Sequence, residues 1–169
     1  MENMKSAIER ELESRTVRWV AWSLLLMCGM ILVRYILVKG GPDNFKRHFE
    51  EVNGMQLLTS GFKRANFIPF ASFVYFYEVR YRFGYVLKNV IGNVAGFVPL
   101  GVLLPVLFPS LRTASRTIGT VFLISLGFET LQLVFNLGVF DVDDLLLNTV
   151  GGSIGYLVFR VGLRLAANL

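Results

Sequence analysis

Residues 90–108, VIGNVAGFVPLGVLLPVLF, form an uncharged apolar run long enough to cross the hydrocarbon core of a bilayer. Three further runs of similar length lie at residues 19–38, 118–139 and 144–163. Charged residues make up 17% of the 169-residue chain, whereas soluble domains carry about a quarter. The sequence therefore predicts an all-α membrane protein, a single domain over residues 1–169 with a bundle of about four transmembrane helices.

The remaining segments predict elements outside the bilayer core. Residues 1–18 are polar and are expected to be a cytoplasmic N-terminal segment, and residues 39–89 form a long connector. A short helix is expected after the helix-breaking Gly-Gly-Pro at residues 40–42. Residues 65–70 predict an apolar turn, which could be re-entrant. Residues 72–87 mix aromatic and charged side chains, which predicts an amphipathic helix lying in the headgroup plane.

The distribution of basic residues predicts the orientation. An even number of spans places both termini and the loop around residues 112–116 on one side of the membrane. The loop at residues 138–144 lies on the other side and contains three aspartates but no Lys or Arg. By the positive-inside rule, both termini are predicted to be cytoplasmic. The basic residues on that side are Lys5, Arg10, Arg15, Arg18, Arg112, Arg116, Arg160 and Arg164.

This basic pattern also indicates the partners. The net charge is +5, but the basic residues lie beside apolar segments, as membrane anchors do, and form no nucleic-acid-binding stripe. We therefore expect membrane lipids as partners and no nucleic acid. The sharper hypothesis is that basic residues of the connector receive a lipid phosphate. The candidates for that role are Lys63, Arg64, Arg80 and Arg82.

Three predicted spans carry polar residues at helical spacing, which places each set on one face of its helix. These sets are Asn89 and Asn93; Glu129, Gln132 and Asn136; and Asp141, Asp144 and Asn148. In the predicted topology, all three sets fall in the outer half of the membrane, and Asn66 joins them if its turn dips inward. The predicted binding residues are Asn66, Asn89, Asn93, Glu129, Gln132, Asp141, Asp144 and Asn148.

Glu129 is the residue most indicative of function. A carboxylate within a span is costly if it faces lipid, so we expect it to face the bundle and to hydrogen-bond to Gln132, Asn93 or Asn148. It is the one candidate for a catalytic acid or base. The other polar residues have a structural alternative as hydrogen bonds between helices.

The aspartates near the fourth span have two readings. Asp141 and Asp144 could supply oxygen ligands to Mg²⁺, although no cofactor is established by the sequence. Alternatively, Asp141 is a turn residue and Asp144 is a helix N-cap. Two glycine pairs, Gly92 with Gly96 and Gly151 with Gly155, predict a close-packed seam between the second and fourth spans.

Four motifs stand in one order along the chain and resemble those of VanZ-like membrane proteins. They are NFIPF at residues 66–70, NVIGNVAGFVPLG at 89–101, ETLQ at 129–132 and DVDDLLLNTVGG at 141–152. The resemblance covers the chain from about residue 66 to the C-terminus. It implies a four-helix protein of the bacterial plasma membrane and a link to resistance against the glycopeptide teicoplanin. It supplies no reaction.

Three functions remain open at this point. The first is a protein that binds a lipid, a lipid-linked cell-envelope intermediate or a glycopeptide in an outer polar pocket. The second is a membrane enzyme that acts on a phosphate-containing lipid through Glu129, Asp141 and Asp144. The third is a transporter or proton relay, formed as a homo-oligomer. No histidine stands near the polar residues, no cysteine lies at their depth, and no Ser–His pairing is present. This argues against histidine-dependent phosphatases and serine proteases.

Overall fold

The computed structural model describes residues 10, 12–37, 54–71, 74, 83–135 and 137–168. Within these residues the fold is all-helical, apart from an isolated bridge between Asn66 and Asp141. Four helical stretches are long and apolar enough to span a membrane, which confirms the predicted fold class. The elements are α2 (Arg15–Leu32), the π-helix η1 (Val33–Leu37), α4 (Gly54–Arg64), α6 (Phe83–Leu107), the 3₁₀ turn η2 (Pro109–Leu111), α7 (Ala114–Phe135) and α8 (Val142–Ala166).

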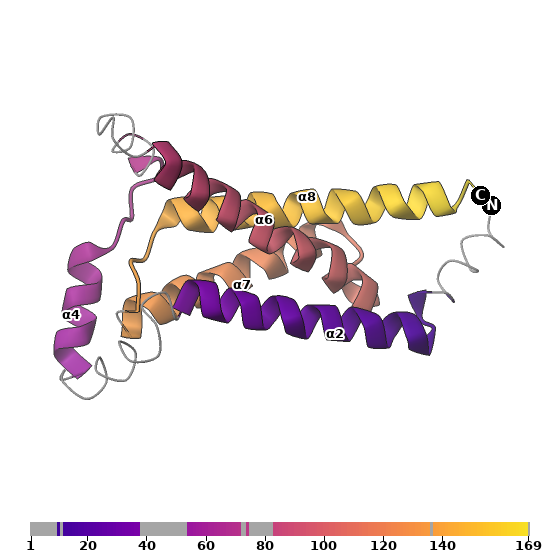
Figure 1. The fold of residues 1–169 in the computed structure, drawn as a ribbon, viewed down its shortest axis with the longest axis horizontal. Helices are drawn as coiled ribbons and strands as arrows, with labels where there is room; N and C mark the ends of the chain where they lie inside the picture. The colour runs from indigo at the N-terminus through magenta and orange to yellow at the C-terminus, as the bar shows by residue number, and fades with distance from the viewer. Residues whose placement is uncertain are drawn as a thin grey trace.

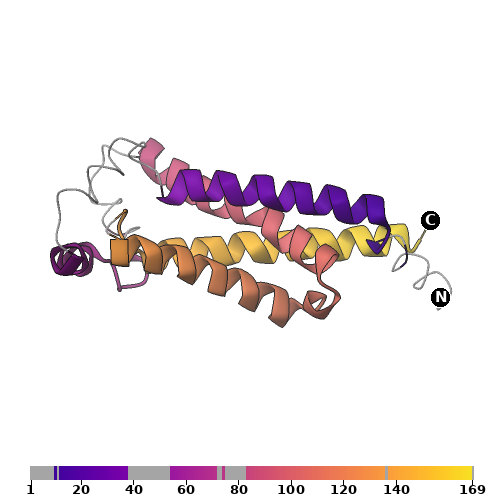
Figure 2. The same ribbon diagram turned by 90° about the horizontal axis from the view of Figure 1, so that it is seen from below.

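The four long helices run along one axis and make an elongated bundle (Figures 1 and 2). Helix α4 crosses one end of this bundle, where α6 and α8 begin and α7 ends (Figure 1). We call this the polar end. The start of α2 and the end of α8 lie together at the opposite end, here called the terminal end (Figure 1). The first span therefore begins, and the last span ends, at the same end of the bundle, as an even number of spans requires.

The helix boundaries differ from the predicted ones at several termini. Helix α2 begins at Arg15, four residues before the predicted span, because the Ser14 side chain accepts a hydrogen bond from the Val17 N–H. Helix α6 begins at Phe83. It therefore includes residues 83–87, which the sequence predicts to belong to the amphipathic helix in the headgroup plane. Most of that predicted helix, and the short helix expected after residues 40–42, lie outside the described residues.

The tightest contact in the bundle is the seam between α6 and α8. A Cβ atom at Gly151 would overlap the backbone carbonyl of Val94, and one at Gly155 would overlap that of Val98. On the α6 side, a Cβ at Gly101 would likewise overlap the carbonyl of Gly152. Only glycine permits the two backbones to approach this closely, so the predicted role of Gly151 and Gly155 is confirmed.

The second glycine pair packs differently from the prediction. A Cβ at Gly92 would lie 2.8 Å from the Tyr35 hydroxyl, and one at Gly96 would lie 3.2 Å from a Leu32 methyl group. Both glycines therefore face α2 and η1, and the expectation that they join the α8 seam is wrong. The GxxxG spacing marks a smooth helix face, but it does not say which neighbour that face meets.

The hydrophobic core lies between α2, α6 and α7, and apolar side chains also cover the outside. Phe97 and Val121 are fully buried in this core. On the outer faces, Leu26, Leu123 and Leu157 are each more than three-fifths exposed. Large apolar side chains on the perimeter of long helices are expected where lipid, not water, surrounds the bundle.

Candidate functional site

Asp144 links α8 to α6 at the polar end. One of its carboxylate oxygens accepts a hydrogen bond from Asn89 Nδ2 at 2.9 Å and another from Asn93 Nδ2 at 2.5 Å. The two asparagines are four residues apart and reach the same acceptor, so they share the face of α6 that the spacing predicted. Asn93 is buried, whereas Asn89 and Asp144 are half-buried. The aspartate thus stands at the boundary between the bundle interior and its surroundings.

The turn that follows α4 is fastened to the start of α8. Asn66 donates its side-chain amide to Asp141 at 2.8 Å. Its backbone N–H donates to the Phe140 carbonyl at 2.8 Å, and its carbonyl accepts from the Val142 N–H at 3.1 Å. These bonds form a short parallel bridge between two segments far apart in the sequence. Asn66 is therefore in contact with another predicted site residue, Asp141.

Asp143 is a member of this cluster that sequence reasoning missed. It is 1% exposed and accepts a hydrogen bond from the Phe70 N–H at 2.5 Å. Phe70 has a φ of 66°, a left-handed conformation that is rare for a bulky side chain. The helical spacing favoured Asp141, Asp144 and Asn148, which excluded Asp143 from the predicted face. Its place in the first turn of α8 was the available signal, because acidic side chains near a helix N-terminus bind free N–H groups.

Glu129 faces the bundle, as predicted, but none of its predicted partners is correct. It is 2% exposed, and its Oε2 accepts a hydrogen bond from the backbone N–H of Asp141 at 3.0 Å. Asp141, and not Asp144, is the N-cap of α8, and it accepts from the Asp143 N–H at 2.8 Å. Glu129 therefore holds the residue that caps the next helix, next to the positive end of the α8 dipole.

The three predicted partners of Glu129 bond elsewhere. Asn93 donates to Asp144, as described above, and Asn148 donates through Nδ2 to the Ser125 hydroxyl at 2.9 Å. Gln132 donates through Nε2 to the Ile36 carbonyl at 2.9 Å. Each of these bonds joins two different segments, which matches the structural alternative weighed for the amide side chains.

Two of these amides are only half satisfied. Asn148 is 1% exposed and Gln132 is 2% exposed. Their carbonyl oxygens, Asn148 Oδ1 and Gln132 Oε1, have no hydrogen-bond donor within the part of the chain that the structure describes. A buried acceptor without a donor is unfavourable, and it calls for an explanation such as a bound water or a ligand.

The polar end thus unites residues from a connector turn and three long helices. A family model described as VanZ/LLP1 matches residues 20–164. The chain belongs to the VanZ/LLP1 family. The match extends well before residue 66, where the resemblance of the sequence motifs began. No curated protein and no solved structure matches the chain.

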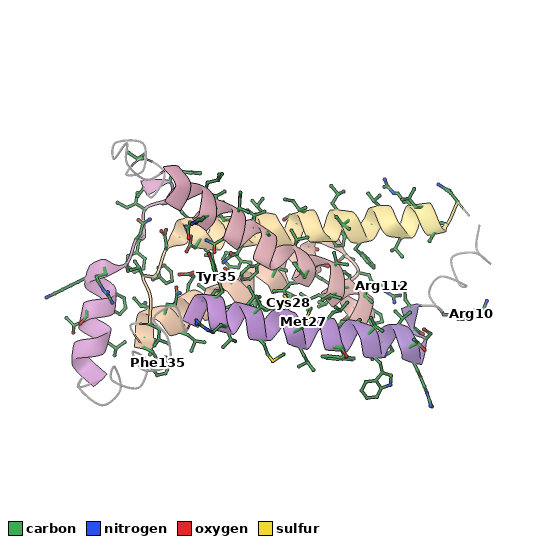
Figure 3. All side chains as sticks on the ribbon, in the orientation of Figure 1. Arg10, Met27, Cys28, Tyr35, Arg112 and Phe135 are labelled. Carbon is green, nitrogen blue, oxygen red and sulfur yellow. The ribbon has the colours of Figure 1, made fainter. Side chains whose placement is uncertain are left out.

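In this VanZ/LLP1 protein, the end of the first span is a π-helix. Gln132 donates to the Ile36 carbonyl within it, and the Tyr35 side chain lies against Gly92 on α6. Tyr35 is directed toward the middle of the bundle in Figure 3. Gly92 adjoins Asn93, so the tyrosine lies beside the site. The sequence carried no signal for this arrangement, although π-turns often occur at functional sites.

Two of the four basic residues predicted to receive a phosphate, Lys63 and Arg64, are among the described residues. Lys63 and Arg64 are exposed in the last turn of α4, directly before the Asn66 turn of this VanZ/LLP1 protein. Arg80, Arg82 and Asn136 lie outside the described residues. Among the described residues, no group of three His, Cys, Asp or Glu side chains is arranged to hold a metal ion. Mg²⁺ binding by Asp141 and Asp144 therefore stays a prediction.

Proposed function

We propose that this VanZ/LLP1 protein binds the polar headgroup of a membrane lipid or of a lipid-linked cell-envelope intermediate at its polar end. The observation that carries the proposal is the pair of buried amide oxygens, on Asn148 and Gln132, that have no donor in the described structure. Both lie one turn from a carboxylate on the same helix, Asp144 and Glu129 respectively. A headgroup with hydroxyl or amine donors supplies what these acceptors lack.

The surroundings of the cluster suit a lipid. Asp141 and Asp144 are half-buried, so a ligand can reach them from the bundle surface. Phe67, Ile68 and Phe70 are exposed on the turn that is fastened to α8, where they provide an apolar contact for acyl chains. In this proposal, Lys63 and Arg64 receive the phosphate of the headgroup.

The proposed location gives this binding a physiological meaning. In a bacterial plasma membrane with both termini in the cytoplasm, the polar end faces outward. There it would meet the lipid-linked precursors of the cell envelope. Glycopeptides also reach their targets on this side of the membrane. Binding of such a precursor would change the access of teicoplanin to its target, and deletion of the protein would change teicoplanin susceptibility.

One observation favours catalysis as a second candidate. Glu129 is a buried carboxylate within a membrane span, and it accepts a hydrogen bond from the backbone N–H of the half-buried Asp141. A carboxyl group fixed in this way is a suitable general acid or base for a bound lipid. The two candidate functions share the site and differ in whether the ligand leaves changed.

Glu129→Gln separates these candidates. The change is isosteric and keeps an acceptor for the Asp141 N–H, so the fold should persist while the charge is lost. Thr130→Val, an isosteric change at the neighbouring exposed residue, is the matched control, because the Thr130 hydroxyl bonds only within its own helix. Wild type and both variants would be purified in detergent, checked for folding and incubated with bacterial membrane lipids and Mg²⁺. Mass spectrometry would then record both retained and newly formed species.

We expect a lipid that wild type and Thr130→Val retain and Glu129→Gln loses, without a new product. A product formed by wild type and not by Glu129→Gln would establish the enzyme instead. Equal lipid retention by all three proteins would refute a binding role for Glu129. If Mg²⁺ takes part, EDTA would release the lipid from wild type.

A further inference from the structure

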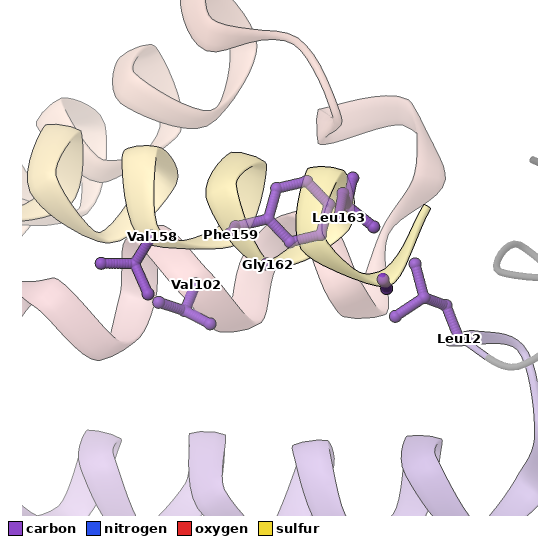
Figure 4. A pocket seen from close by; sticks show the side chains of 7 residues that line it. Leu12, Val102, Val158, Phe159, Gly162 and Leu163 are labelled. Carbon is purple, nitrogen blue, oxygen red and sulfur yellow. The ribbon is translucent and has the colours of Figure 1, made fainter. Parts of the chain in front are cut away.

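A cavity lies at the terminal end of the bundle, away from the polar site. It is an apolar groove of about 420 Å³ between Leu12, α6 and α8 (Figure 4). Its volume falls within the ~300–1,000 Å³ typical of ligand sites. Every lining residue is apolar: Leu12, Val102, Val158, Phe159, Gly162, Leu163 and Ala166.

The groove exists because α6 and α8 stop packing closely toward the terminal end. At Gly155 a Cβ atom would overlap the Val98 carbonyl, so the backbones touch. Two turns later, a Cβ at Gly162 would meet nothing within 4 Å. Gly162 lines open space, and no contact in the described structure requires a glycine there.

Arg112 is hydrogen-bonded to both helices that line this groove, α6 and α8. Arg112 donates through Nε to the Pro105 carbonyl at 3.3 Å, and Pro105 lies one turn from the groove residue Val102. The Arg112 carbonyl accepts from the Tyr156 hydroxyl at 3.1 Å, one turn from Phe159. Arg112 is marked at the terminal end in Figure 3. Its Nη2 is buried and finds no acceptor among the described residues.

We propose that the groove and Arg112 together bind one anionic phospholipid, with an acyl chain in the groove and a phosphate oxygen on the guanidinium. The guanidinium would turn toward the membrane boundary to place Nη2 on the phosphate, a geometry that it recognises well. This site is separate from the one proposed above, since it lies at the opposite end of the bundle.

The charge at this end favours a lipid over a second copy of the chain. Glu13 is the single acidic residue within the described parts of 10–20, 108–118 and 156–168. The same segments hold seven arginines, and a second copy seated on the groove would bring these like charges together. An anionic headgroup is attracted instead. The arginines are Arg10, Arg15, Arg18, Arg112, Arg116, Arg160 and Arg164.

Two variants test the two halves of this site, and the chain offers a matched control for each. Gly162→Leu fills the groove, whereas Gly119→Leu adds the same side chain at another glycine with open space around its Cβ. Arg112→Gln removes the proposed phosphate ligand, whereas Arg116→Gln removes the same charge from an exposed residue in the first turn of α7. Each protein would be placed in nanodiscs of phosphatidylcholine with one-third phosphatidylglycerol, extracted gently and analysed by native mass spectrometry.

We expect wild type, Gly119→Leu and Arg116→Gln to retain one phosphatidylglycerol each, at least fivefold above phosphatidylcholine. Gly162→Leu should lose the bound lipid of either kind, and Arg112→Gln should lose the preference for phosphatidylglycerol. Retention by Gly162→Leu at the wild-type level would overturn the assignment of the groove. An equal loss of preference in Arg116→Gln would reduce the role of Arg112 to general surface charge. If Arg112→Gln does not fold, the two glycine variants still decide whether the groove holds the lipid.

Discussion

Helices α6 and α8 contact each other in two ways along their length, and the contrast separates scaffold from site. In the middle of the bundle, Gly151, Gly155 and Gly101 bring the two backbones into direct contact. At the polar end, Asn89 and Asn93 reach across to Asp144. Hydrogen bonds between membrane helices average only about 0.6 kcal/mol. We therefore expect the glycine seam to contribute more to the stability of the bundle than the hydrogen bonds at the polar end.

The largest effect is expected from breaking the glycine seam. Gly155→Leu would drive a side chain into the Val98 carbonyl, a backbone atom that cannot move aside without separating α6 from α8. We expect little or no folded protein by size-exclusion chromatography in detergent. Gly119→Leu is the control and should behave as wild type, since its Cβ meets open space. A monodisperse Gly155→Leu with the wild-type melting temperature would show that the seam is not needed.

A smaller loss is expected from removing the hydrogen bonds at the polar end. Asp144→Ala leaves the Asn89 and Asn93 amides without this acceptor, so the free energy of unfolding should fall by about 1–3 kcal/mol. Asn93→Ala alone should lower it by about 1 kcal/mol. Denaturation by SDS in mixed micelles measures both. A loss from Asp144→Ala as severe as that from Gly155→Leu would mean that the polar end is the main scaffold after all.

The smallest effect concerns the turn that joins the site. Phe70 holds a φ of 66°, which disfavours residues with a Cβ by about 1–2 kcal/mol. Phe70→Gly should therefore be more stable than Phe70→Ala by about 1 kcal/mol, because both lose the same exposed ring and only glycine adopts this φ freely. Comparison of the two melting curves gives the difference. Equal stability would indicate that the turn relaxes and is not held by Asp143.

The fold followed from the sequence because span length and apolar character are local properties. Each predicted span has its counterpart in a long helix, and the polar faces follow from helical spacing alone. The convergence of Asn89, Asn93 and Asp144 was also predictable, since predicted spans of opposite direction bring them to one depth. The contact between Asn66 and Asp141 was predicted only on the condition that the Asn66 turn dips inward, because no pattern fixes the path of a connector. In contrast, the spacing of residues along a helix does not determine which neighbouring helix a given face packs against. Gly92 and Gly96 therefore packed on α2 instead of α8.

The interactions that escaped prediction mostly involve backbone groups. Glu129 accepts from the Asp141 N–H, Asp143 accepts from the Phe70 N–H, and Gln132 donates to the Ile36 carbonyl. Every residue carries the same backbone groups, so no sequence pattern distinguishes the one that a buried side chain will use. The π-helix around Tyr35 was not predicted either. Its residues are of the same types as those of the α-helix before it, so no sequence pattern marks the change.

The most direct test of the proposed site is ligand-dependent stability. The lipid that co-purifies with wild type would be added back at increasing concentration to delipidated wild type, Glu129→Gln and Thr130→Val, and the melting temperature would be recorded. A ligand that binds the folded state raises the melting temperature as its concentration rises. We expect this rise in wild type and Thr130→Val and its absence in Glu129→Gln, with all three melting alike when no lipid is added. An equal rise in all three proteins would contradict the assignment of Glu129 to a ligand site.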